Sequence, residues 1–309
     1  MSSIQQIKEL RERTAAGMGD CKKALEEAGG DMDKAVEIIL KKGQAKSAKR
    51  AGKIAAEGQV HAEVYGDGRE AVVFEVNIET DFSARNDKFL SVVEAATSAV
   101  KAAKGSDTEF GKLVHEGKTL QEHADAVTAV IGEKITLRRY AKLAVPEGKE
   151  GMCHAYVHMG GKIGVILCLE AENAAATKHE ATATFADDTA MQIAAMNPRW
   201  LAQGDVDQAE VAKQKEIYEA QLREEPKPKP EAVWPKIVEG KVAAWYKEVV
   251  LLDMPSVQHK KAISELLAEA GKAAGGKLTI AGFQRFELGE GIEKKQEDRV
   301  AGVAELLDV

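Results

Sequence analysis

The sequence is poor in aromatic residues and cysteine, and it contains no long apolar run. Aromatic residues make up 5% and all hydrophobic residues 44% of the 309 residues, which is typical of a soluble, helix-rich chain of about two domains. The three cysteines, Cys21, Cys153 and Cys168, form no CxxC pair, which indicates reduced thiols in a cytoplasmic protein. No apolar run approaches the ~18 residues of a membrane span, and the first residues, MSSIQQIKELRERT, lack the apolar region of a secretion signal. We therefore expect a cytoplasmic protein that makes no contact with membranes.

An excess of positive charge is also missing. The 43 Lys and Arg residues stand against 50 Asp and Glu residues, a formal net charge of −7, which argues against nucleic-acid binding over the whole surface. Residues 41–53 form a basic run without an acidic residue before Glu57. Such a run can contact phosphate, but it has no interleaved aromatic residues. We therefore interpret residues 44–57 as a basic, solvated linker.

Sequence motifs of enzymes are absent. The run GKT at 117–119 resembles a phosphate-binding loop, but Lys112 stands where the loop needs its first glycine. No GxGxxG, GxSxG or HExxH occurs. His154 and His158 could share one face of a strand and bind a metal, yet only Cys153 lies nearby and no acidic ligand does. We therefore predict no catalytic residues, no metal and no cofactor. An enzyme that uses Asp81 and His158 as acid and base requires these two side chains to converge.

The first 43 residues predict a compact three-helix domain. Ile4, Ile7 and Leu10 share one helical face, Gly29-Gly30 ends a second helix, and Asp31 can cap a third that ends before Gly43. A unit this small holds little core, which favours a binding module over a catalytic one.

Residues 58–145 show a β-β-α-α-β pattern that starts again near residue 151. HAEVYGDGREAVVFEV from His61 aligns without gaps to HAYVHMGGKIGVILCL from His154, with five identical positions in sixteen. The strand at 277–288 resembles the segment at 132–143. We interpret residues 58–145 and 151–292 as two related α+β subdomains with antiparallel sheets, and chance similarity of two hairpins remains the alternative.

The second subdomain contains an insertion at about 205–247. Two helical patterns flank a segment that holds four of the seven prolines, Pro226, Pro228, Pro230 and Pro235. Proline this dense is incompatible with a helix interior, so the insertion is predicted to be an antiparallel helical hairpin with a stiff turn.

The segment Glu75–Asn86 allows two interpretations. Thr80 and Asp81 could cap a helix while Phe82 enters the core. Alternatively, Asp81 and Phe82 form an exposed tip, an aromatic wedge beside a carboxylate that enters a groove of a partner and contests a cation site there.

Four segments closely resemble the elongation factor Ts family, the guanine-nucleotide exchange factors of bacterial translation. They are LRERTAAGMGDCKKAL (10–25), EVNIETDFSARN (75–86), AYVHMGGKIGVIL (155–167) and FQRFELGEGIEK (283–294). They follow the order of the family over the whole chain. The resemblance implies a ubiquitin-associated-type N-terminal domain, a duplicated α+β core, an inserted coiled-coil hairpin and a C-terminal helical segment at 293–309.

The resemblance also implies a function without covalent catalysis. Family members bind elongation factor Tu with GDP, and the Asp-Phe tip, here Asp81 and Phe82 flanked by Thr80 and Asn86, enters Tu near the magnesium and the phosphates. His158 matches a family histidine that presses on another Tu helix. Arg11 and Met18 match residues that touch the nucleotide domain of Tu. The chain itself is expected to bind no nucleotide and no nucleic acid.

The chain departs from the family at a few positions. Ser83 stands where valine is usual and Ile78 where a smaller residue is usual, and Gly19 follows Met18 where some relatives have an apolar residue. These departures bear on affinity. The alternative function is a ubiquitin-associated-type binding or chaperone protein without exchange activity, which explains residues 1–43 but leaves the tip and the repeated core without a role.

Overall fold

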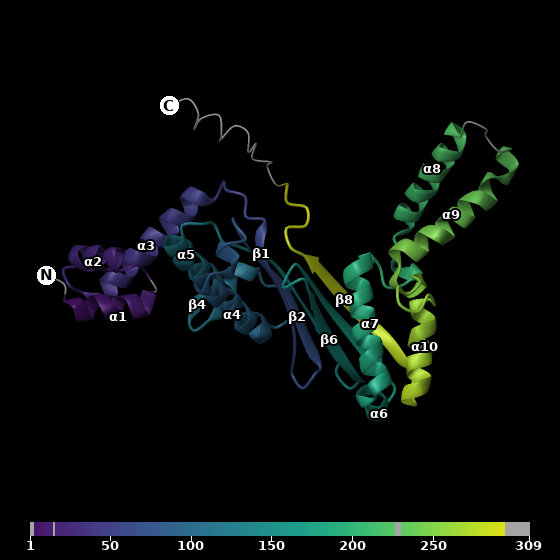
Figure 1. Ribbon diagram of the computed structural model, residues 1–309, viewed down its shortest axis with the longest axis horizontal. Helices are drawn as coiled ribbons and strands as arrows, with labels where there is room; N and C mark the ends of the chain where they lie inside the picture. The colour runs from purple at the N-terminus through teal and green to yellow at the C-terminus, as the bar shows by residue number, and fades with distance from the viewer. Residues whose placement is uncertain (1–2, 15, 226–229, 294–309) are drawn as a thin grey trace.

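The computed structural model describes residues 3–14, 16–225 and 230–293. Three N-terminal helices precede two antiparallel sheets with helices on their outer faces, and a helical hairpin projects from the far end (Figure 1). The predicted mixed α+β class with antiparallel sheets is confirmed. The helices of four or more residues are α1 (Ile4–Thr14), α2 (Met18–Glu27), α3 (Met32–Arg50), α4 (Asp87–Ala102), α5 (Leu120–Ile131), α6 (Ala174–Lys178), α7 (Glu180–Met196), α8 (Gln208–Glu224), α9 (Trp234–Val249) and α10 (Ile263–Ala274). The strands are β1 (Glu57–Tyr65), β2 (Glu70–Ile78), β3 (Val114–His115), β4 (Lys118–Thr119), β5 (Thr136–Ala144), β6 (Glu150–His158), β7 (Ile163–Ala171) and β8 (Leu278–Glu287).

The N-terminal helices α1–α3 pack around a small core that includes Leu10, Cys21 and Leu25. The predicted stop after α2 is confirmed, because the Gly30 N–H donates to Leu25 O at 2.8 Å and Gly30 has a positive φ of 88°. Asp31 caps α3 as predicted, since its side chain accepts from the N–H groups of two residues in the first turn of that helix.

The predicted end of the third helix at Gly43 is wrong, because α3 continues to Arg50. Gly43 is buried inside the helix, where an added Cβ would lie 3.4 Å from Asp125 O and 3.5 Å from Ala129 Cβ of α5. The glycine therefore allows α3 and α5 to approach closely instead of ending α3. The first seven residues of the predicted linker 44–57 are consequently helical.

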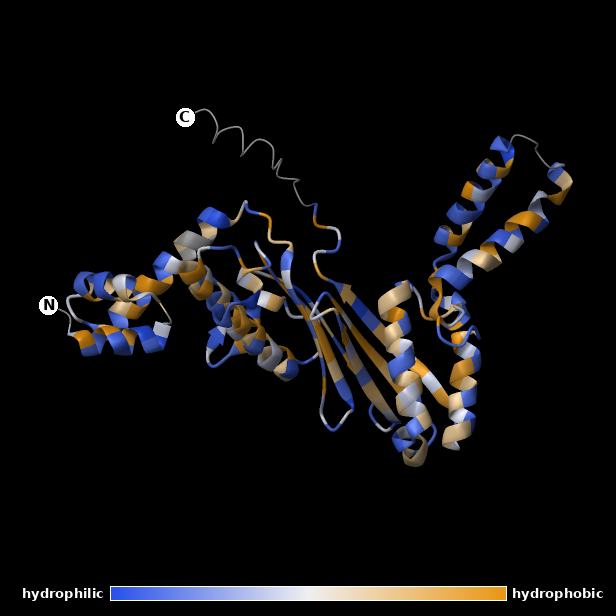
Figure 2. Cartoon of the chain, in the orientation of Figure 1, coloured by the Kyte–Doolittle hydropathy of each residue, from blue (hydrophilic) through white to orange (hydrophobic). Residues whose placement is uncertain are grey.

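The core consists of four layers in the order helices, sheet, sheet, helices. One sheet has the strand order β1-β2-β5 and the other β6-β7-β8, with all pairs antiparallel. Side chains alternate along β2, so that Val72, Phe74 and Val76 pack under α4 and α5 while Ala71 and Val73 face the second sheet. The second sheet packs under α7 and α10 in the same way. Both side-chain faces of β2 and β7 therefore carry buried apolar residues, and hydrophobic (orange) segments lie along the strands in Figure 2.

The two sheets repeat local backbone geometry at the aligned positions. Gly58 and Gly151 each occupy the second residue of a first strand, and a Cβ there would lie 2.2 and 2.1 Å from the facing carbonyl oxygens of Val76 and Leu169. A register shift follows Glu75 in one sheet and the aligned residue Cys168 in the other. The predicted repeat therefore extends to backbone detail. The last strands of the two sheets match with a different offset from the one that the sequence similarity of 132–143 to 277–288 predicts. Tyr140 pairs with Phe74, and Phe283 pairs with Leu167, the residue aligned with Phe74. The offset differs by two residues, so the same side-chain faces are kept.

The sheets are joined by reciprocal backbone hydrogen bonds. The Val60 N–H donates to Gly161 O at 2.8 Å, and the Cys153 N–H, from the aligned position of the other sheet, donates to Gly68 O at 2.7 Å. Each first strand is thus bound to the hairpin of the opposite sheet, in an approximately two-fold arrangement.

The insertion forms the predicted antiparallel pair of helices, α8 and α9, which projects from the core (Figure 1). Trp245, Val242 and Leu222 are buried where the two helices meet each other and the core. Pro235 lies in the first turn of α9, where its missing N–H costs no helical bond. Pro226, Pro228 and the segment 294–309, expected to be helical, lie outside the described residues.

Candidate partner-binding surface

The segment between β2 and α4 forms an exposed tip, residues 79–86. β2 ends at Ile78, and Asn86 begins α4 by accepting a hydrogen bond from the Lys88 N–H at 2.9 Å. Asn86 therefore has a structural role as the helix cap, the role that one interpretation gave to Thr80 and Asp81. The residues between fold into one short 3₁₀ turn, Ser83–Arg85.

Phe82 and Asp81 point away from the protein. The Phe82 side chain is 83% exposed, so its expected alternative place in the core is wrong. Asp81 is also exposed, and its carboxylate lies 3.9 Å from Arg85 in an open ion pair that contributes little. The tip thus presents an aromatic ring and a carboxylate side by side to solvent.

Glu133 binds the tip on both sides of these two residues. It lies directly after Gly132, whose positive φ of 83° ends α5. Its carboxylate accepts from the Thr80 N–H at 3.0 Å, from the Thr80 hydroxyl at 3.0 Å and from the Ser83 hydroxyl at 2.7 Å. The sequence analysis missed Glu133, and the only local signal is its position after a helix-ending glycine.

The base of the tip is held by Glu79. Its carboxylate accepts from Arg50 at 2.8 and 2.9 Å and from the Lys134 N–H at 2.6 Å. Arg50 is the last residue of α3, so Glu79 joins the N-terminal helices to the tip. This contact uses one cation of the basic run, and Lys42 pairs with Glu27 at 2.7 Å.

A buried carboxylate lies in β2 beneath the tip. Glu75 is fully buried and accepts hydrogen bonds at 2.8–3.0 Å from Arg138, Arg139, Asn77 and the Gly289 N–H. Burial by itself raises the pKa of Glu75, but the bonds from the Gly289 N–H, Arg138 and Asn77 and the charge of Arg139 together lower it below its ordinary value. Because Gly289 follows β8, Glu75 ties the end of the second sheet to the first.

His158 lies at the end of β6 in an exposed hairpin. Its Nδ1 shares a 2.9 Å hydrogen bond with the Tyr156 hydroxyl, and the two rings are stacked. The hairpin lies against the start of β1, since Lys162 pairs with Glu57 at 3.0 Å. Glu57 in turn pairs with Ile78, the residue before the tip. The His158 hairpin and the tip therefore lie at the same end of the sheets.

Arg11 lies in α1 and Met18 begins α2, two helices of the N-terminal bundle, which Figure 1 shows at one end of the molecule. Met18 is 57% exposed, so it is not part of the small core, and Arg11 is exposed as well.

In the described part of the chain, the side chains considered for acid–base catalysis or metal binding do not converge on one site. Asp81 and His158 contact Arg85 and Tyr156 respectively, and not each other. His154 pairs with Asp187 at 3.2 Å. Among the described residues, no group of three or more His, Cys, Asp or Glu side chains is arranged to hold a metal ion.

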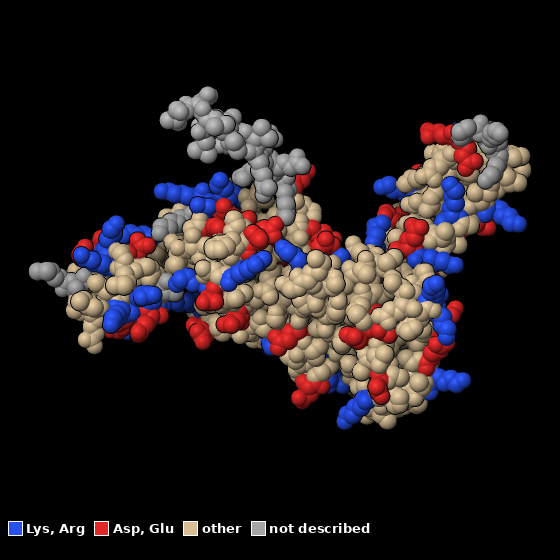
Figure 3. All heavy atoms as spheres, in the orientation of Figure 1, with Lys and Arg blue, Asp and Glu red and all other residues tan. Residues whose placement is uncertain are grey.

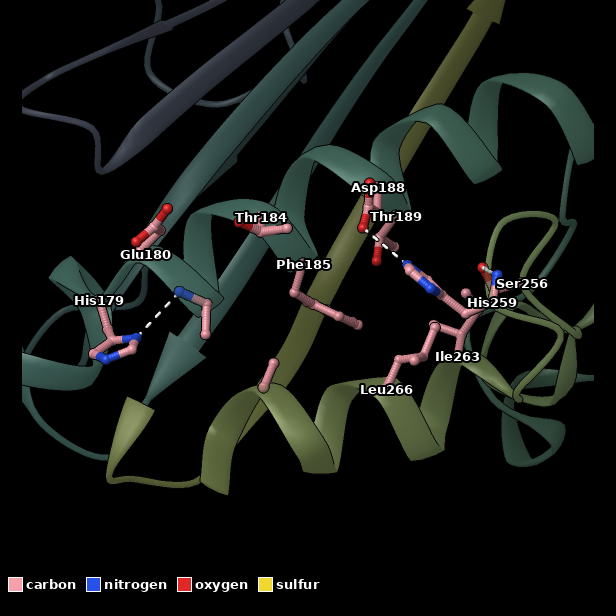
Figure 4. A pocket seen from close by; sticks show the side chains of 12 residues that line it. His179, Glu180, Thr184, Phe185, Asp188, Thr189, Ser256, His259, Ile263 and Leu266 are labelled. Carbon is pink, nitrogen blue, oxygen red and sulfur yellow. Dashed lines mark hydrogen bonds and ion pairs between the residues drawn. The ribbon is translucent and has the colours of Figure 1, made fainter. Parts of the chain in front are cut away.

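A groove of about 380 Å³ between α7 and α10 contains two histidines (Figure 4). His259 lies 3.4 Å from Asp188. The nearby Ser256 hydroxyl accepts from the backbone N–H groups of Gln258 and His259, so it is engaged in a local turn. Apolar side chains such as Phe185 and Ile263 form the floor.

The visible surface carries charges of both signs. Figure 3 shows Lys and Arg interspersed with Asp and Glu over the bundle, the core and the hairpin. Within residues 3–14, 16–225 and 230–293, no helix is long and apolar enough to span a membrane.

Known proteins match this chain over almost its whole length. The family model "Elongation factor TS" matches residues 79–290. Elongation factor Ts of a Nitratiruptor species is 47% identical over 307 residues, covering 98% of both chains. The protein of the same name from Clostridium perfringens is 43% identical over 309 residues, covering 99% of both, and that of Clostridium kluyveri is 41% identical over 303 residues, covering 96% of both. The chain therefore belongs to the elongation factor Ts family, whose members are nucleotide exchange factors for elongation factor Tu in translation elongation and not enzymes.

Proposed function

We propose that this chain binds elongation factor Tu carrying GDP, inserts Asp81 and Phe82 beside the magnesium and phosphate site, and thereby releases GDP. The observation that carries the proposal is the 83% exposure of Phe82 on a tip whose neighbouring residues are hydrogen-bonded. An aromatic ring exposed to water contributes little to the stability of the free protein. Once it is buried in an apolar groove of a partner, it stabilises the complex.

Each residue of the tip has a distinct physical task. Burial of Phe82 against Tu supplies about 1.5–3 kcal/mol. The Asp81 carboxylate competes with the phosphates for magnesium, and loss of the cation removes a large positive charge from beside GDP. By linkage, a factor that binds nucleotide-free Tu more tightly than Tu with GDP weakens GDP binding by the same ratio.

The other contacts extend the same interface. The position of the His158 hairpin at the same end of the sheets as the tip supports a second contact. In this proposal His158 presses on another helix of Tu. Arg11 and Met18, both exposed, supply a separate contact from the ubiquitin-associated-type domain 1–43. Thr80 and Asn86 shape the tip. Subdomains 58–145 and 151–292 form a duplicated core that holds these surfaces.

The test is release of a fluorescent GDP analogue from purified elongation factor Tu, measured by stopped flow at several concentrations of this chain. The wild-type chain is expected to accelerate release in proportion to its concentration. Phe82→Ala should reduce the acceleration about tenfold to a hundredfold, which corresponds to the loss of its burial energy, and Asp81→Ala should reduce the maximal rate.

Val114→Ala provides the matched control. Val114 is 57% exposed in β3, a strand that precedes the opposite end of α5 from Glu133, so its truncation should leave exchange unchanged. Circular dichroism should show all three variants folded, because the altered side chains are exposed. Failure of the wild-type chain to accelerate release from a cognate Tu would favour a binding or chaperone protein without exchange activity.

A further inference from the structure

The residues that carry the tip lie outside the strands and the α-helices of the described chain, and their one regular element is the 3₁₀ turn Ser83–Arg85. Between Ile78 and Asp87, the backbone bonds Ala84 N–H to Thr80 O and Asn86 N–H to Ser83 O are local. Within the described part of the chain, the side-chain bonds that join residues 80–83 to another element all end on Glu133. Ala84 packs against the apolar core, and the orientation of residues 80–83 rests on polar bonds to one carboxylate, contributed from a position 50 residues further along the chain.

The bonds to Glu133 lie on the two flanks of the wedge. Thr80 precedes Asp81, and Ser83 follows Phe82. The Thr80 hydroxyl also accepts from the Ser83 N–H at 3.2 Å, which closes the turn between the two flanks. With both flanks held, Asp81 and Phe82 can only project outward, as their exposure shows.

We propose that Glu133 is a positioning residue for the exchange reaction. It holds the tip in the conformation that enters elongation factor Tu, and it touches neither Tu nor GDP. This inference rests on the proposed function of the tip. Hydrogen bonds to a charged acceptor are stronger than neutral ones, and a preorganised tip loses less conformational freedom on binding than a loose one.

A loose tip has a recognisable kinetic signature. When only a fraction of the chains is competent to bind, the apparent affinity falls by that fraction, while the bound complex is unchanged. Glu133→Ala should therefore raise the half-saturating concentration in the exchange assay about tenfold, equivalent to 1.4 kcal/mol. The limiting rate should stay within about twofold of wild type, in contrast to Asp81→Ala, which lowers it.

Conservative and double variants separate positioning from general damage. Glu133→Gln retains an acceptor oxygen for Thr80 and should restore part of the affinity. Ser83→Ala should show a smaller loss, and Glu133→Ala with Ser83→Ala should be no worse than Glu133→Ala alone, because both changes remove the same bond. Hydrogen exchange of the Thr80 amide should accelerate in Glu133→Ala without any partner present.

The matched control is Glu122→Ala in the first turn of α5, the helix that ends just before Glu133. Glu122 accepts from the N–H of Thr119 at 2.7 Å and from its hydroxyl at 2.8 Å, the same chemistry at the opposite end of α5. If Glu122→Ala raises the half-saturating concentration as much as Glu133→Ala, stability of α5 explains the effect and the inference is wrong.

The inference is also wrong if Glu133→Ala exchanges GDP with wild-type kinetics while Phe82→Ala is slower. In that case the proposed function of the tip still stands. Wild-type kinetics in Phe82→Ala overturns the proposed function itself. If Glu133→Ala does not fold, Ser83→Ala replaces it as the test. A wild-type half-saturating concentration and wild-type hydrogen exchange of the Thr80 amide in Ser83→Ala would count against the inference.

Discussion

At the scale of single residues, Glu75 carries the largest electrostatic cost in the described core. A fully buried charge loses its hydration, and four hydrogen-bond donors, two of which are guanidinium groups, compensate for the loss. Arg139 also donates to Glu287 O and to the Glu290 carboxylate, both at 3.0 Å. Removing the carboxylate charge would therefore leave Arg138 without its ion-pair partner and Arg139 with Glu290 alone.

Glu75→Gln should lower the free energy of unfolding by about 3 kcal/mol at pH 7, the range for breaking a buried ion pair. The pKa of Glu75 is lowered from 4.5 in the folded chain. The stability it contributes is therefore complete above that ordinary value and is lost as the pH falls through the folded value. The difference in free energy of unfolding between wild type and Glu75→Gln should therefore become smaller at pH 4 and below, as measured by urea unfolding.

The comparison is internally controlled. Asp31 and Glu122 also have lowered pKa values, from backbone hydrogen bonds at helix starts, but they titrate in both proteins and cancel in the difference. An equal gap at pH 7 and pH 3 would show that Glu75 contributes by shape and not by charge.

The sequence could indicate the residues of the tip but not their orientation. Local patterns offer Thr80 and Asp81 as helix caps, and the structure gives the cap of α4 to Asn86. The projection of Phe82 depends on Glu133, whose proximity results from the pairing of β2 with β5. Contacts between residues that distant in the chain leave no local signal.

At the scale of elements, α3 joins the N-terminal bundle to the core. It packs against α1 and α2 in its first half and against α5 where Gly43 lies. Its last residue, Arg50, binds Glu79 at the base of the tip. The helix therefore fixes where the bundle, with Arg11 and Met18, stands relative to the tip.

Substitutions at Gly43 should separate helix propensity from packing. Gly43→Ala places a Cβ at ordinary contact distance from Asp125 O and Ala129 Cβ, and it should stabilise the chain by up to about 1 kcal/mol through helix propensity. Gly43→Leu should destabilise the chain by about 1–3 kcal/mol, since a larger side chain forces α3 and α5 apart. Thermal unfolding followed by circular dichroism measures both. If Gly43→Leu raises the unfolding temperature, α3 and α5 are not closely packed in solution.

Elements with strong periodicity were predictable, and elements defined by distant packing were not. The β-β-α-α-β order predicted for residues 58–145 is confirmed by β1, β2, α4, α5 and β5. Gly43 misled because glycine locally favours a helix end, whereas its actual partner, α5, lies about 80 residues further along the chain. The short strands β3 and β4, of two residues each, have no periodicity to read.

At the scale of the whole molecule, the two similar sheets pack face to face through one shared apolar layer. The layer between them contains small or medium side chains such as Val60, Ala71, Val73 and Cys153. Sequence alignment predicts the repeat, but it does not predict that the two sheets pack face to face. That arrangement depends on the reciprocal bonds of Val60 and Cys153 across the interface.

Gly164 provides a test of this interface, with Gly282 of the same sheet as its matched control. A Cβ at Gly164 would lie 2.6 Å from Val60 Cγ1 and 3.2 Å from Val73 Cγ2 of the other sheet, whereas at Gly282 its nearest neighbour is Leu143 Cδ2 at 3.8 Å. Gly164→Ala should therefore lower the free energy of unfolding by about 1–3 kcal/mol, while Gly282→Ala should change it little. Because the tip belongs to the first sheet and His158 to the second, Gly164→Ala should also weaken binding to elongation factor Tu while Gly282→Ala does not. Urea unfolding and stopped-flow GDP release measure the two effects, and equal behaviour of the two variants would mean that the sheets do not pack this closely.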